Sequence, residues 1–255
     1  MDYQTLTSKV NNVAFKSIVE GLDINDFINV TNDTNTPISF FHLNIRSFNK
    51  NFNELLIYLN NFTFKFDVII LSEIWCNFEV STDRILNGYE YFYKINKTNK
   101  AGGVVIYIKS SFQATDFDLS FLHEDEKLDI IGVSFKHMNL RYNIFGLYHH
   151  HKNLIRKLSN TIIDIKLHLC NTNKTIFVGD FNVNMLNYGM NLDITEWVDT
   201  LLENEFTFII QSPTRVTNTT KTIIDNYVLY GAPFKHDDIL HGSINTYITD
   251  HMLLY

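Results

Sequence analysis

The chain has 255 residues, the size of one large α/β domain or of two small ones. Hydrophobic residues make up 45% of it and aromatic residues 14%, which is ample for a core and excludes global disorder. The net charge of -7 argues against a simple basic module for nucleic acids, because phosphate contacts need Lys and Arg. A nuclease remains compatible with it, since affinity can come from a local patch and metal ions.

The cysteines and the N-terminus point to an intracellular protein. Cys76 and Cys170 form neither a zinc-ligand pattern nor a disulfide framework, which favours a reducing compartment. The first residues lack the basic, apolar leader of a secretion signal, and no uncharged apolar run approaches the ~20 residues of a membrane span. We therefore expect a nuclear or cytoplasmic protein that is not secreted and has no membrane partner.

Taken in chain order, the pattern begins with a polar leader over 1–36, with a short helix near 13–21, outside a main domain over 37–255. Apolar spacing predicts helices over 51–62 and 153–169. Buried strands are expected over 38–43, 66–71, 102–108, 129–135, 141–148, 174–178, 206–210 and 222–229, with 129–135 and 141–148 forming a hairpin.

Two local patterns add detail. The alternation of Tyr89, Tyr91 and Tyr93 with other side chains indicates a further strand. Asp193 with Glu196 three residues later has the spacing of a capping box, so Asp193 is expected to cap a helix. A few helices among many strands predict an α/β (α+β) fold of two mixed β-sheets packed face to face, with helices outside.

Several of these strands end in an acid or an amide. Asp180 and Asn182 follow the apolar run 176–178, and a period of two puts both side chains on one side. Each such residue alone could be a solvated strand end, a satisfied buried acid or a turn cap. Acids seldom lie within apolar runs without partners, so their repetition predicts one shared site. The other residues of this kind are Asn44, Glu73, Asp225, Asp250 and His251.

Several different short motifs follow one another along residues 38–255. They are Leu43-Asn44-Ile45-Arg46-Ser47, Leu71-Ser72-Glu73-Ile74-Trp75, Gly102-Gly103-Val104, Gly146-Leu147-Tyr148, Gly179-Asp180-Phe181-Asn182, Pro213-Thr214-Arg215, Ile224-Asp225 and Thr249-Asp250-His251. This ordered set resembles the endonuclease/exonuclease/phosphatase family, and within it the endonuclease domain of non-LTR retrotransposons (LINE elements of the jockey or CR1 type).

The resemblance implies a DNase I-like four-layer sandwich, in which two packed mixed β-sheets are flanked by helices. It also implies hydrolysis of DNA phosphodiester bonds with Mg²⁺ or Mn²⁺ as cofactor, hard cations that prefer oxygen ligands. The nick would leave a 3′-hydroxyl that primes reverse transcription. DNA is thus the expected partner, and a reverse transcriptase domain is expected in an intact element.

The same resemblance implies the roles of the charged residues. Glu73 and Asp250 would bind the metal, which would neutralise the developing negative charge. Asp180 would orient or deprotonate the attacking water, since an Asp with an ordinary pKa of about 3.9 is ionised at neutral pH. His251 would stabilise the transition state, held in orientation by Asp225.

The polar residues have implied roles as well. Tyr148 would hydrogen-bond the phosphate. Asn44 and Asn182 would position phosphate oxygens and the neighbouring acid through their amide donors. Arg46, Thr214 and Asn182 are expected to bind substrate, and positioning of a neighbouring group is the alternative role of Thr214.

The chain departs from the family pattern at several positions. His149-His150-His151 follow Tyr148, where the family usually has Arg and prolines, which weakens phosphate contact unless His149 substitutes. This run is interpreted as a solvated turn, because adjacent side chains in a strand do not converge on a metal. Asn226 stands where His is common, and Thr249 replaces the usual Ser while keeping the hydroxyl.

Weaker features complete the prediction. The basic stretch 94–100 is expected to be a solvated loop, with contact to the DNA backbone as the alternative. Trp75 is expected to pack beneath the site. The chain stops at Tyr255 within the expected last core strand, so the domain is predicted to be truncated there. The competing functions are a phosphatase or phospholipase of the same fold and an inactive or DNA-binding remnant of a retrotransposon.

Overall fold

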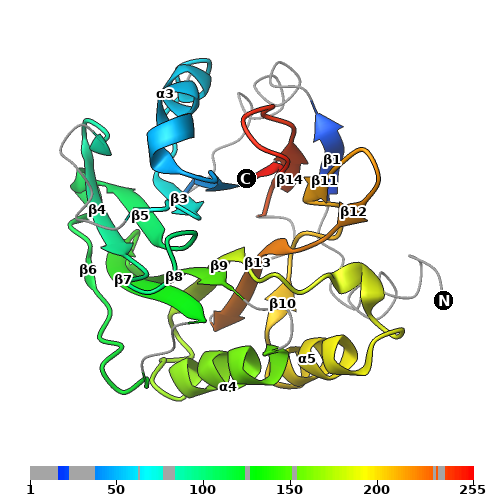
Figure 1. Cartoon of the computed structure of the whole chain (residues 1–255). Helices are drawn as coiled ribbons and strands as arrows, with labels where there is room; N and C mark the ends of the chain where they lie inside the picture. The colour runs from blue at the N-terminus through cyan, green and yellow to red at the C-terminus, as the bar shows by residue number, and fades with distance from the viewer. Residues whose placement is uncertain are drawn as a thin grey trace.

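Two β-sheets packed face to face form the centre of the molecule, and helices cover their outer faces (Figure 1). The computed structural model describes residues 17–22, 38–62, 64–76, 84–123, 127–150, 154–231, 234 and 239–255, with the backbone alone for 17–22. The expected four-layer sandwich of two mixed sheets flanked by helices is confirmed.

The larger sheet has seven strands in the order β1-β14-β15-β2-β3-β5-β4. The pairs β1/β14 and β2/β3 are parallel, and the other neighbours are antiparallel. The strands are β1 (Ser17–Leu22), β2 (Phe40–Asn44), β3 (Val68–Ser72), β4 (Tyr89–Lys94), β5 (Val104–Lys109), β14 (His241–Ile244) and β15 (Leu253–Leu254).

The smaller sheet has six strands in the order β10-β13-β9-β8-β7-β6, and only β8 and β9 are parallel neighbours within it. The predicted hairpin of β7 and β8 is confirmed. A separate pair, β11 with β12, lies beside the sheets. The strands are β6 (Thr115–Asp116), β7 (Leu128–His137), β8 (Leu140–His149), β9 (Lys174–Asp180), β10 (Thr207–Phe208), β11 (Arg215–Val216), β12 (Lys221–Thr222) and β13 (Asp225–Gly231).

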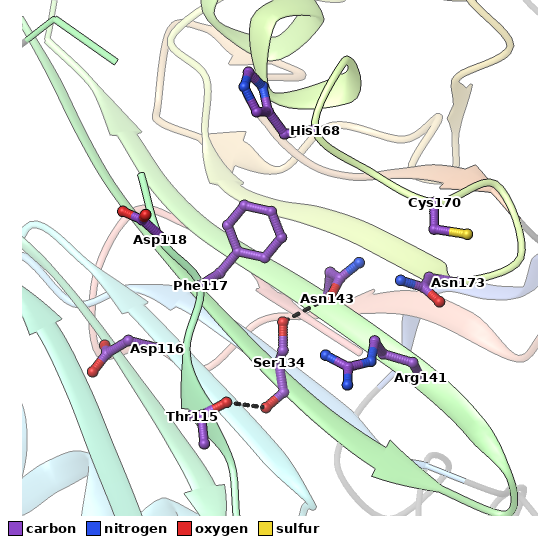
Figure 2. A pocket seen from close by; sticks show the side chains of 10 residues that line it. All are labelled: Thr115, Asp116, Phe117, Asp118, Ser134, Arg141, Asn143, His168, Cys170 and Asn173. Carbon is purple, nitrogen blue, oxygen red and sulfur yellow. Dashed lines mark hydrogen bonds between the residues drawn. The ribbon is translucent and has the colours of Figure 1, made fainter. Parts of the chain in front are cut away.

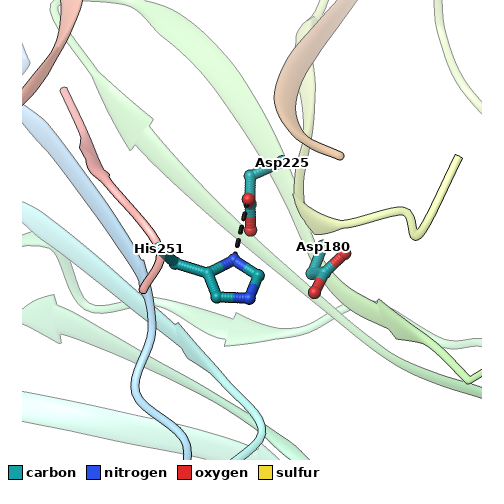
Figure 3. Close-up of side chains that lie close together, drawn as sticks. All are labelled: Asp180, Asp225 and His251. Atoms are coloured by element: carbon teal, nitrogen blue, oxygen red, sulfur yellow. Dashed lines mark hydrogen bonds and ion pairs between the residues drawn. The ribbon is translucent and has the colours of Figure 1, made fainter. Parts of the chain in front are cut away.

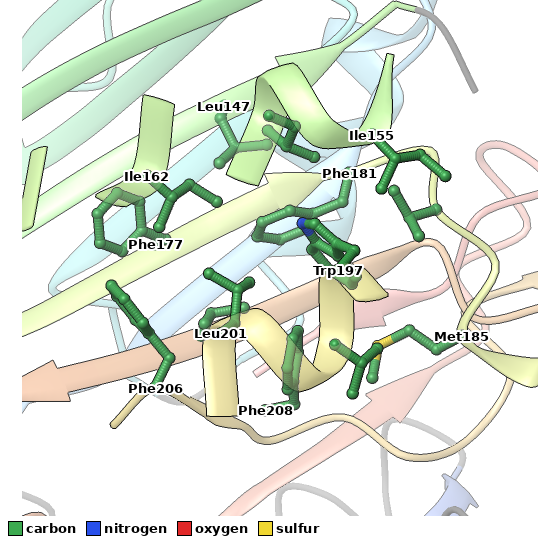
Figure 4. Close-up of a cluster of buried hydrophobic side chains, with 14 of the residues drawn as sticks. Leu147, Ile155, Ile162, Phe177, Phe181, Met185, Trp197, Leu201, Phe206 and Phe208 are labelled. Carbon is green, nitrogen blue, oxygen red and sulfur yellow. The ribbon is translucent and has the colours of Figure 1, made fainter. Parts of the chain in front are cut away.

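Three α-helices among the described residues form the outer layers. Helix α3 buries Phe48, Phe52 and Leu55 against the seven-stranded sheet. Helices α4 and α5 lie side by side under the six-stranded sheet, where Trp197 packs against Phe181 (Figures 1 and 4). No helix among the described residues is long and apolar enough to cross a membrane. The helices are α3 (Phe48–Leu59), α4 (Ile155–Lys166) and α5 (Leu192–Glu203), with 3₁₀ turns η2 (Ser110–Phe112) and η3 (Met185–Asn187).

Strand β3 illustrates why the central strands are apolar throughout. Val68 and Ile70 face the six-stranded sheet, whereas Ile69 and Leu71 face the layer of α3. Alternate side chains of a strand point to opposite faces, and here both faces are covered. A continuous apolar run is therefore required, and the same run ends directly before the polar residues of the candidate site.

The expected capping box of α5 is wrong. The N-cap is Asn191, whose side-chain oxygen accepts a hydrogen bond from the Ile194 amide at 3.1 Å. Asp193 lies in the first turn of the helix instead. Glu196 pairs with Arg156 of α4 at 2.7 Å, so a contact between helices replaces the expected local one.

The helix expected near 13–21 is also wrong over the part that the structure describes. Ser17–Leu22 form β1, which pairs in parallel with β14, and residues 13–16 lie outside the described residues. A partner strand more than 200 residues away in sequence outweighs the local spacing. The very short strands β6, β11 and β12, and the four-residue β14, were not expected either, because so few residues carry no periodicity.

Candidate active site at the meeting of the two sheets

The candidate site lies where strand ends of both sheets come together. Asn44 is the last residue of β2 and Glu73 directly follows β3, and these strands are parallel neighbours. Asp180 ends β9 in the other sheet, and Asp225 begins β13 directly opposite it. Parallel neighbours end at one edge, so the fold itself gathers these polar residues.

Asn44 joins the two sheets. Its amide nitrogen donates to Glu73 Oε1 at 2.8 Å and to Asp180 Oδ2 at 2.9 Å. The side chain is fully buried, so both bonds are shielded from water. The second oxygen of Glu73 accepts from the Trp75 indole nitrogen at 3.0 Å. Two carboxylates from different sheets are thus held at a fixed separation by one amide.

Asp225 and His251 form a buried pair next to Asp180. His251 Nδ1 donates to Asp225 Oδ2 at 2.9 Å, and Thr214 Oγ1 donates to the same oxygen at 2.8 Å. Figure 3 shows the imidazole bonded to Asp225, with the Asp180 side chain next to this pair. One ligand atom from each of Asp180, Asp225 and His251 lies within 4.8 Å of the others.

This crowding changes the ionisation of the site. Burial, and then the charge of Asp225, raise the pKa of Asp180 to about 7. Burial alone would lower the pKa of His251, but Asp225 and Asp180 outweigh it and raise that pKa. Asp180 is therefore a stronger base than the ordinary carboxylate assumed from the sequence.

Asp250 lies between two arginines. Its carboxylate is 2.6 Å from Arg46 and 2.8 Å from Arg215, which comes from β11. Burial alone would raise the pKa of Asp250, but the bond from Arg215 and the charge of Arg46 hold it below its usual range. The preceding Thr249 donates to the Asn44 carbonyl at 3.1 Å, so the hydroxyl retained at this position anchors the loop.

Tyr148 and Asn182 complete the rim. Burial raises the pKa of Tyr148, and Glu73 and Asp180 raise it further, so its hydroxyl stays protonated as a donor. The backbone amide of Asn182 donates to Asp180 Oδ1 at 2.9 Å. Its side-chain amide donates to the His149 carbonyl at 2.8 Å, which ties the end of β8 to the end of β9.

The backbone is strained at these strand ends. Five of the ten non-glycine residues with positive φ among those described lie here: Arg46, Ser47, Glu73, Trp75 and Asn182. Such conformations are costly for residues with a Cβ and concentrate at functional sites. This backbone strain is an observation separate from the residue types, and it occurs at the same strand ends as the polar residues of the candidate site.

Sequence comparison places the chain in a family. The model of the Endonuclease/Exonuclease/phosphatase family matches residues 41–251. The chain belongs to this family. No curated protein sequence matches it significantly.

Solved structures of the family share the fold. The endonuclease domain of TRAS1, a telomere-specific non-LTR retrotransposon, has a TM-score of 0.65 at 13% identity, over 86% of this chain and 96% of that one. An AP endonuclease from Archaeoglobus fulgidus has a TM-score of 0.61 at 13% identity, over 85% and 97%. The 3′ phosphatase NExo from Neisseria, bound to a product DNA hairpin, has a TM-score of 0.60 at 14% identity, over 85% and 97%. At these identities the likeness establishes the fold, which is the DNase I-like nuclease and phosphatase fold expected from the motifs.

The structure brings together the five positions on which the family resemblance depends. A continuous set of contacts connects them, and none lies on a distant surface. Those five residues are Asn44, Glu73, Asp180, Asp225 and His251. Thr214 is completely buried and bonds Asp225, which agrees with its expected role in positioning a neighbouring group rather than with substrate binding. Arg46, also expected to bind substrate, is held by Asp250 with its side chain 36% exposed.

Some contributors were missed or misjudged from the sequence. Trp75 does not pack beneath the site, since it is 40% exposed and bonds Glu73. Arg215 lies in one of the sequence motifs, but the sequence did not predict a role for it. His42 lies fully buried two residues before Asn44, and burial lowers its pKa to about 4, so it adds no charge there at neutral pH. Its sequence signal, a His inside an apolar strand, was visible.

The donor set fits a hard divalent cation. Ligand atoms of Asp180, Asp225 and His251 lie within 4.8 Å of one another, and the Asn44 amide joins Glu73 to Asp180 beside them. Asp225 Oδ1 is buried without a hydrogen-bond partner, and burial followed by the charge of Asp225 raises the pKa of Asp180. Oxygen-rich sites of this kind suit Mg²⁺ or Mn²⁺.

A separate hollow of about 450 Å³ lies far from this site (Figure 2). It adjoins Arg141 near the start of β8, whereas Tyr148 is near the end of that strand, about 23 Å away for an extended chain. Its Asn143 is already bonded to Ser134 Oγ at 2.7 Å. The polar residues that line it include acidic, basic and uncharged side chains, and none of them belongs to the candidate site. They are Thr115, Asp116, Asp118, Ser134, Arg141, Asn143, His168, Cys170 and Asn173, with Phe117 alongside.

Proposed function

We propose that this chain is a divalent-metal-dependent endonuclease that hydrolyses DNA phosphodiester bonds, nicking a target site for retrotransposition. The observation that carries the proposal is the Asn44 amide, which joins Glu73 to Asp180 beside the buried Asp225–His251 pair. Family membership and the likeness to a retrotransposon endonuclease domain support the same function. A nuclear or cytoplasmic location and a reverse transcriptase partner in an intact element follow from it.

Asp180 is the proposed base. Its raised pKa, near neutrality, suits removal of a proton from the attacking water. The Asn182 amide and Asn44 hold its two oxygens, so the carboxylate keeps one orientation. The ordering of an attacking water by a fixed carboxylate contributes to the rate through both alignment and proton transfer.

His251 and Tyr148 act on the phosphate in this proposal. Asp225 fixes the imidazole through Nδ1, so Nε2 is directed at the substrate side. A doubly protonated His251, favoured by its raised pKa, places positive charge where negative charge develops. The protonated Tyr148 hydroxyl donates a further hydrogen bond to a phosphate oxygen.

The metal ligands are proposed to be Glu73 and Asp250. A bound Mg²⁺ or Mn²⁺ would neutralise the scissile phosphate and the leaving oxygen. We propose that Arg46 and Arg215, which pair with Asp250, contact the DNA backbone and replace the Arg missing after Tyr148.

A plasmid-nicking assay tests the proposal. Purified protein with Mg²⁺ should convert supercoiled plasmid to open circles, and EDTA should stop the reaction. Glu73→Ala and His251→Ala should each lower the rate by about 10²–10⁴-fold, the usual effect of removing a group that stabilises charge or transfers protons. Glu196→Ala and His168→Ala, at exposed residues outside the site, are the matched controls. An intact plasmid, or site variants that nick at the wild-type rate, would show the proposal to be wrong.

The second candidate is release of phosphate from a substrate end or lipid head group. The solved 3′ phosphatase of Neisseria, with a similar fold, favours including it. Oligonucleotides with a labelled 3′-phosphate and labelled lipid head groups, assayed beside the plasmid, separate these activities. A variant-sensitive release of phosphate without nicking would replace the first candidate with the second.

A further inference from the structure

The second histidine of the 149–151 run forms a buried hydrogen bond with Asp129. His150 Nε2 lies 2.6 Å from Asp129 Oδ2, and both side chains are only 2% exposed. The sequence predicted a solvated turn for this run. A buried pair of titratable groups next to an active site, with no part in the chemistry described above, requires another explanation.

Neighbouring amides fix the hydrogen-bonding state of this imidazole. The Asn99 side-chain oxygen accepts from the Ala101 amide at 3.0 Å, so its Nδ2 faces His150 Nδ1 at 2.9 Å. Nδ1 therefore accepts, and the proton on Nε2 is donated to Asp129. Asn96 Nδ2 donates to the other oxygen of Asp129 at 3.0 Å. Asn96 Nδ2 also lies 3.0 Å from His150 Nε2, so side-chain amides of the 96–99 segment contact both members of the pair.

One side of the pair supports Tyr148. The His150 ring packs edge-on against the Tyr148 ring, with the centroids 4.5 Å apart. Asp129 lies directly opposite Tyr148 in the ladder of β7 and β8. The Tyr148 ring, whose hydroxyl neighbours Glu73, is thus supported by His150 and by the strand that bears Asp129.

The other side supports the turn that follows β3. Asp129 Oδ2 also accepts from the Gly103 amide at 2.8 Å. The Gly103 carbonyl accepts from Ile74 at 3.3 Å, and the Gly102 carbonyl accepts from Trp75 at 2.9 Å. Asp129 is therefore bonded to the segment that holds the two residues directly after Glu73.

Gly102 shows how close this packing is. A Cβ at this position would lie 2.5 Å from Asp129 Oδ2 and would also overlap the His150 ring. A glycine is thus required for the pair to reach the segment. The Gly102-Gly103 motif and the unusual His150 belong to one arrangement.

We propose that His150 is a positioning residue, which acts through Asp129 to fix Tyr148 and the turn bearing Glu73 in one relative geometry. This inference rests on the proposed function for its effect on rate. The DNA contacts of the nearby basic loop 94–100 are the alternative explanation for any effect of a His150 substitution, and they would alter substrate binding instead.

Two substitutions separate these explanations. His150→Phe keeps an aromatic ring against Tyr148 but removes the donor to Asp129. His150→Gln retains a donor at about the position of Nε2. The same pair of changes at the exposed His168 is the control. The measurements are kcat and KM for plasmid nicking, and amide hydrogen exchange at Ile74, Trp75 and Gly103.

We expect His150→Phe to lower kcat by about 10–100-fold with KM within about twofold of wild type, as for residues that orient a reacting group. The three amides should exchange faster, and His150→Gln should restore most of both properties. Unchanged kcat, a loss confined to KM, or a loss of kcat with unchanged exchange would overturn the inference. His150→Asn, too short to reach Asp129, replaces the Phe variant if that one does not fold. If the wild type itself does not nick DNA, the proposed function fails, and the exchange rates still decide whether His150 holds the turn.

Discussion

Asp180, the proposed base, carries an ionisable group that lowers the stability of the fold when it is charged. It is 1% exposed, and its two oxygens accept bonds from Asn44 and from the Asn182 amide. Those bonds favour the carboxylate, yet burial and Asp225 outweigh them and raise its pKa to about 7. Ionisation of Asp180 near neutral pH therefore lowers the free energy of unfolding.

Asp180→Asn should change the pH dependence of stability. In the native state Asp180 has a pKa of about 7, above its ordinary value of 3.8, so the native state binds more protons between these values. The free energy of unfolding of the wild type must then fall as the pH rises through this window. The variant lacks this term, so its stability relative to wild type should rise by up to about 4 kcal/mol from pH 4 to pH 8.

Urea unfolding in EDTA at several pH values measures this difference, and Asp164→Asn on the exposed face of α4 is the control. The same Asp180 variant should nick DNA about 10²–10⁴-fold more slowly. Parallel stability profiles for the variant and the wild type would show that Asp180 is an ordinary ionised carboxylate.

At the scale of single residues, the sequence predicts which residues form the candidate site better than it predicts their hydrogen-bond partners. The order of Asn44, Glu73, Asp180 and His251 was sufficient to predict that they converge. The burial of Thr214 and the bond from Trp75 to Glu73 depend on segments that pack only in the complete fold. Periodicity carries no information on such contacts, which explains why Trp75 was expected beneath the site.

At the scale of elements, apolar periodicity predicted the long strands and the helices well. Helices α3 and α4 have enough residues to show a period, and strands β3 and β9 are recognised by their continuous apolar runs. Strand β1 forms because β14 offers it an edge, and its local spacing indicated a helix instead. Local capping was similarly uncertain, since Asn191 and Asp193 both precede an apolar helix face.

The cap of α5 gives a direct test. Asn191→Ala removes the acceptor for the Ile194 amide and should lower the free energy of unfolding by about 1 kcal/mol. Asp193→Ala removes only a charge from the first turn, so its effect should be about 0.3–1 kcal/mol and should shrink in high salt. Urea unfolding at low and high salt distinguishes them. A larger, salt-independent loss for Asp193→Ala would restore the capping box expected from the sequence.

At the scale of the whole molecule, the site exists only while the two sheets keep their spacing. Asn44, Glu73 and His251 come from the seven-stranded sheet or its connections, and Asp180 and Asp225 come from the other sheet. The sequence predicted both sheets but not their separation, which depends on how side chains from both faces interdigitate. Alignment of the reacting groups is thus a property of the central core.

Gly146 on β8 sets that spacing at one point. A Cβ there would lie 3.0 Å from side-chain atoms of Val104 and Ile106 on the opposite sheet, so a larger residue must push the sheets apart. Gly146→Val should cost about 1–3 kcal/mol of stability through overpacking. It should also lower kcat by about 100-fold, because a displacement near 1 Å misaligns the reacting groups. Val198→Ala, in the outer layer between α5 and the six-stranded sheet, weakens packing without separating the sheets and should retain kcat. Nicking rates compared well below both melting temperatures decide the matter: equal kcat for Gly146→Val and wild type would mean that the site tolerates a change in sheet spacing.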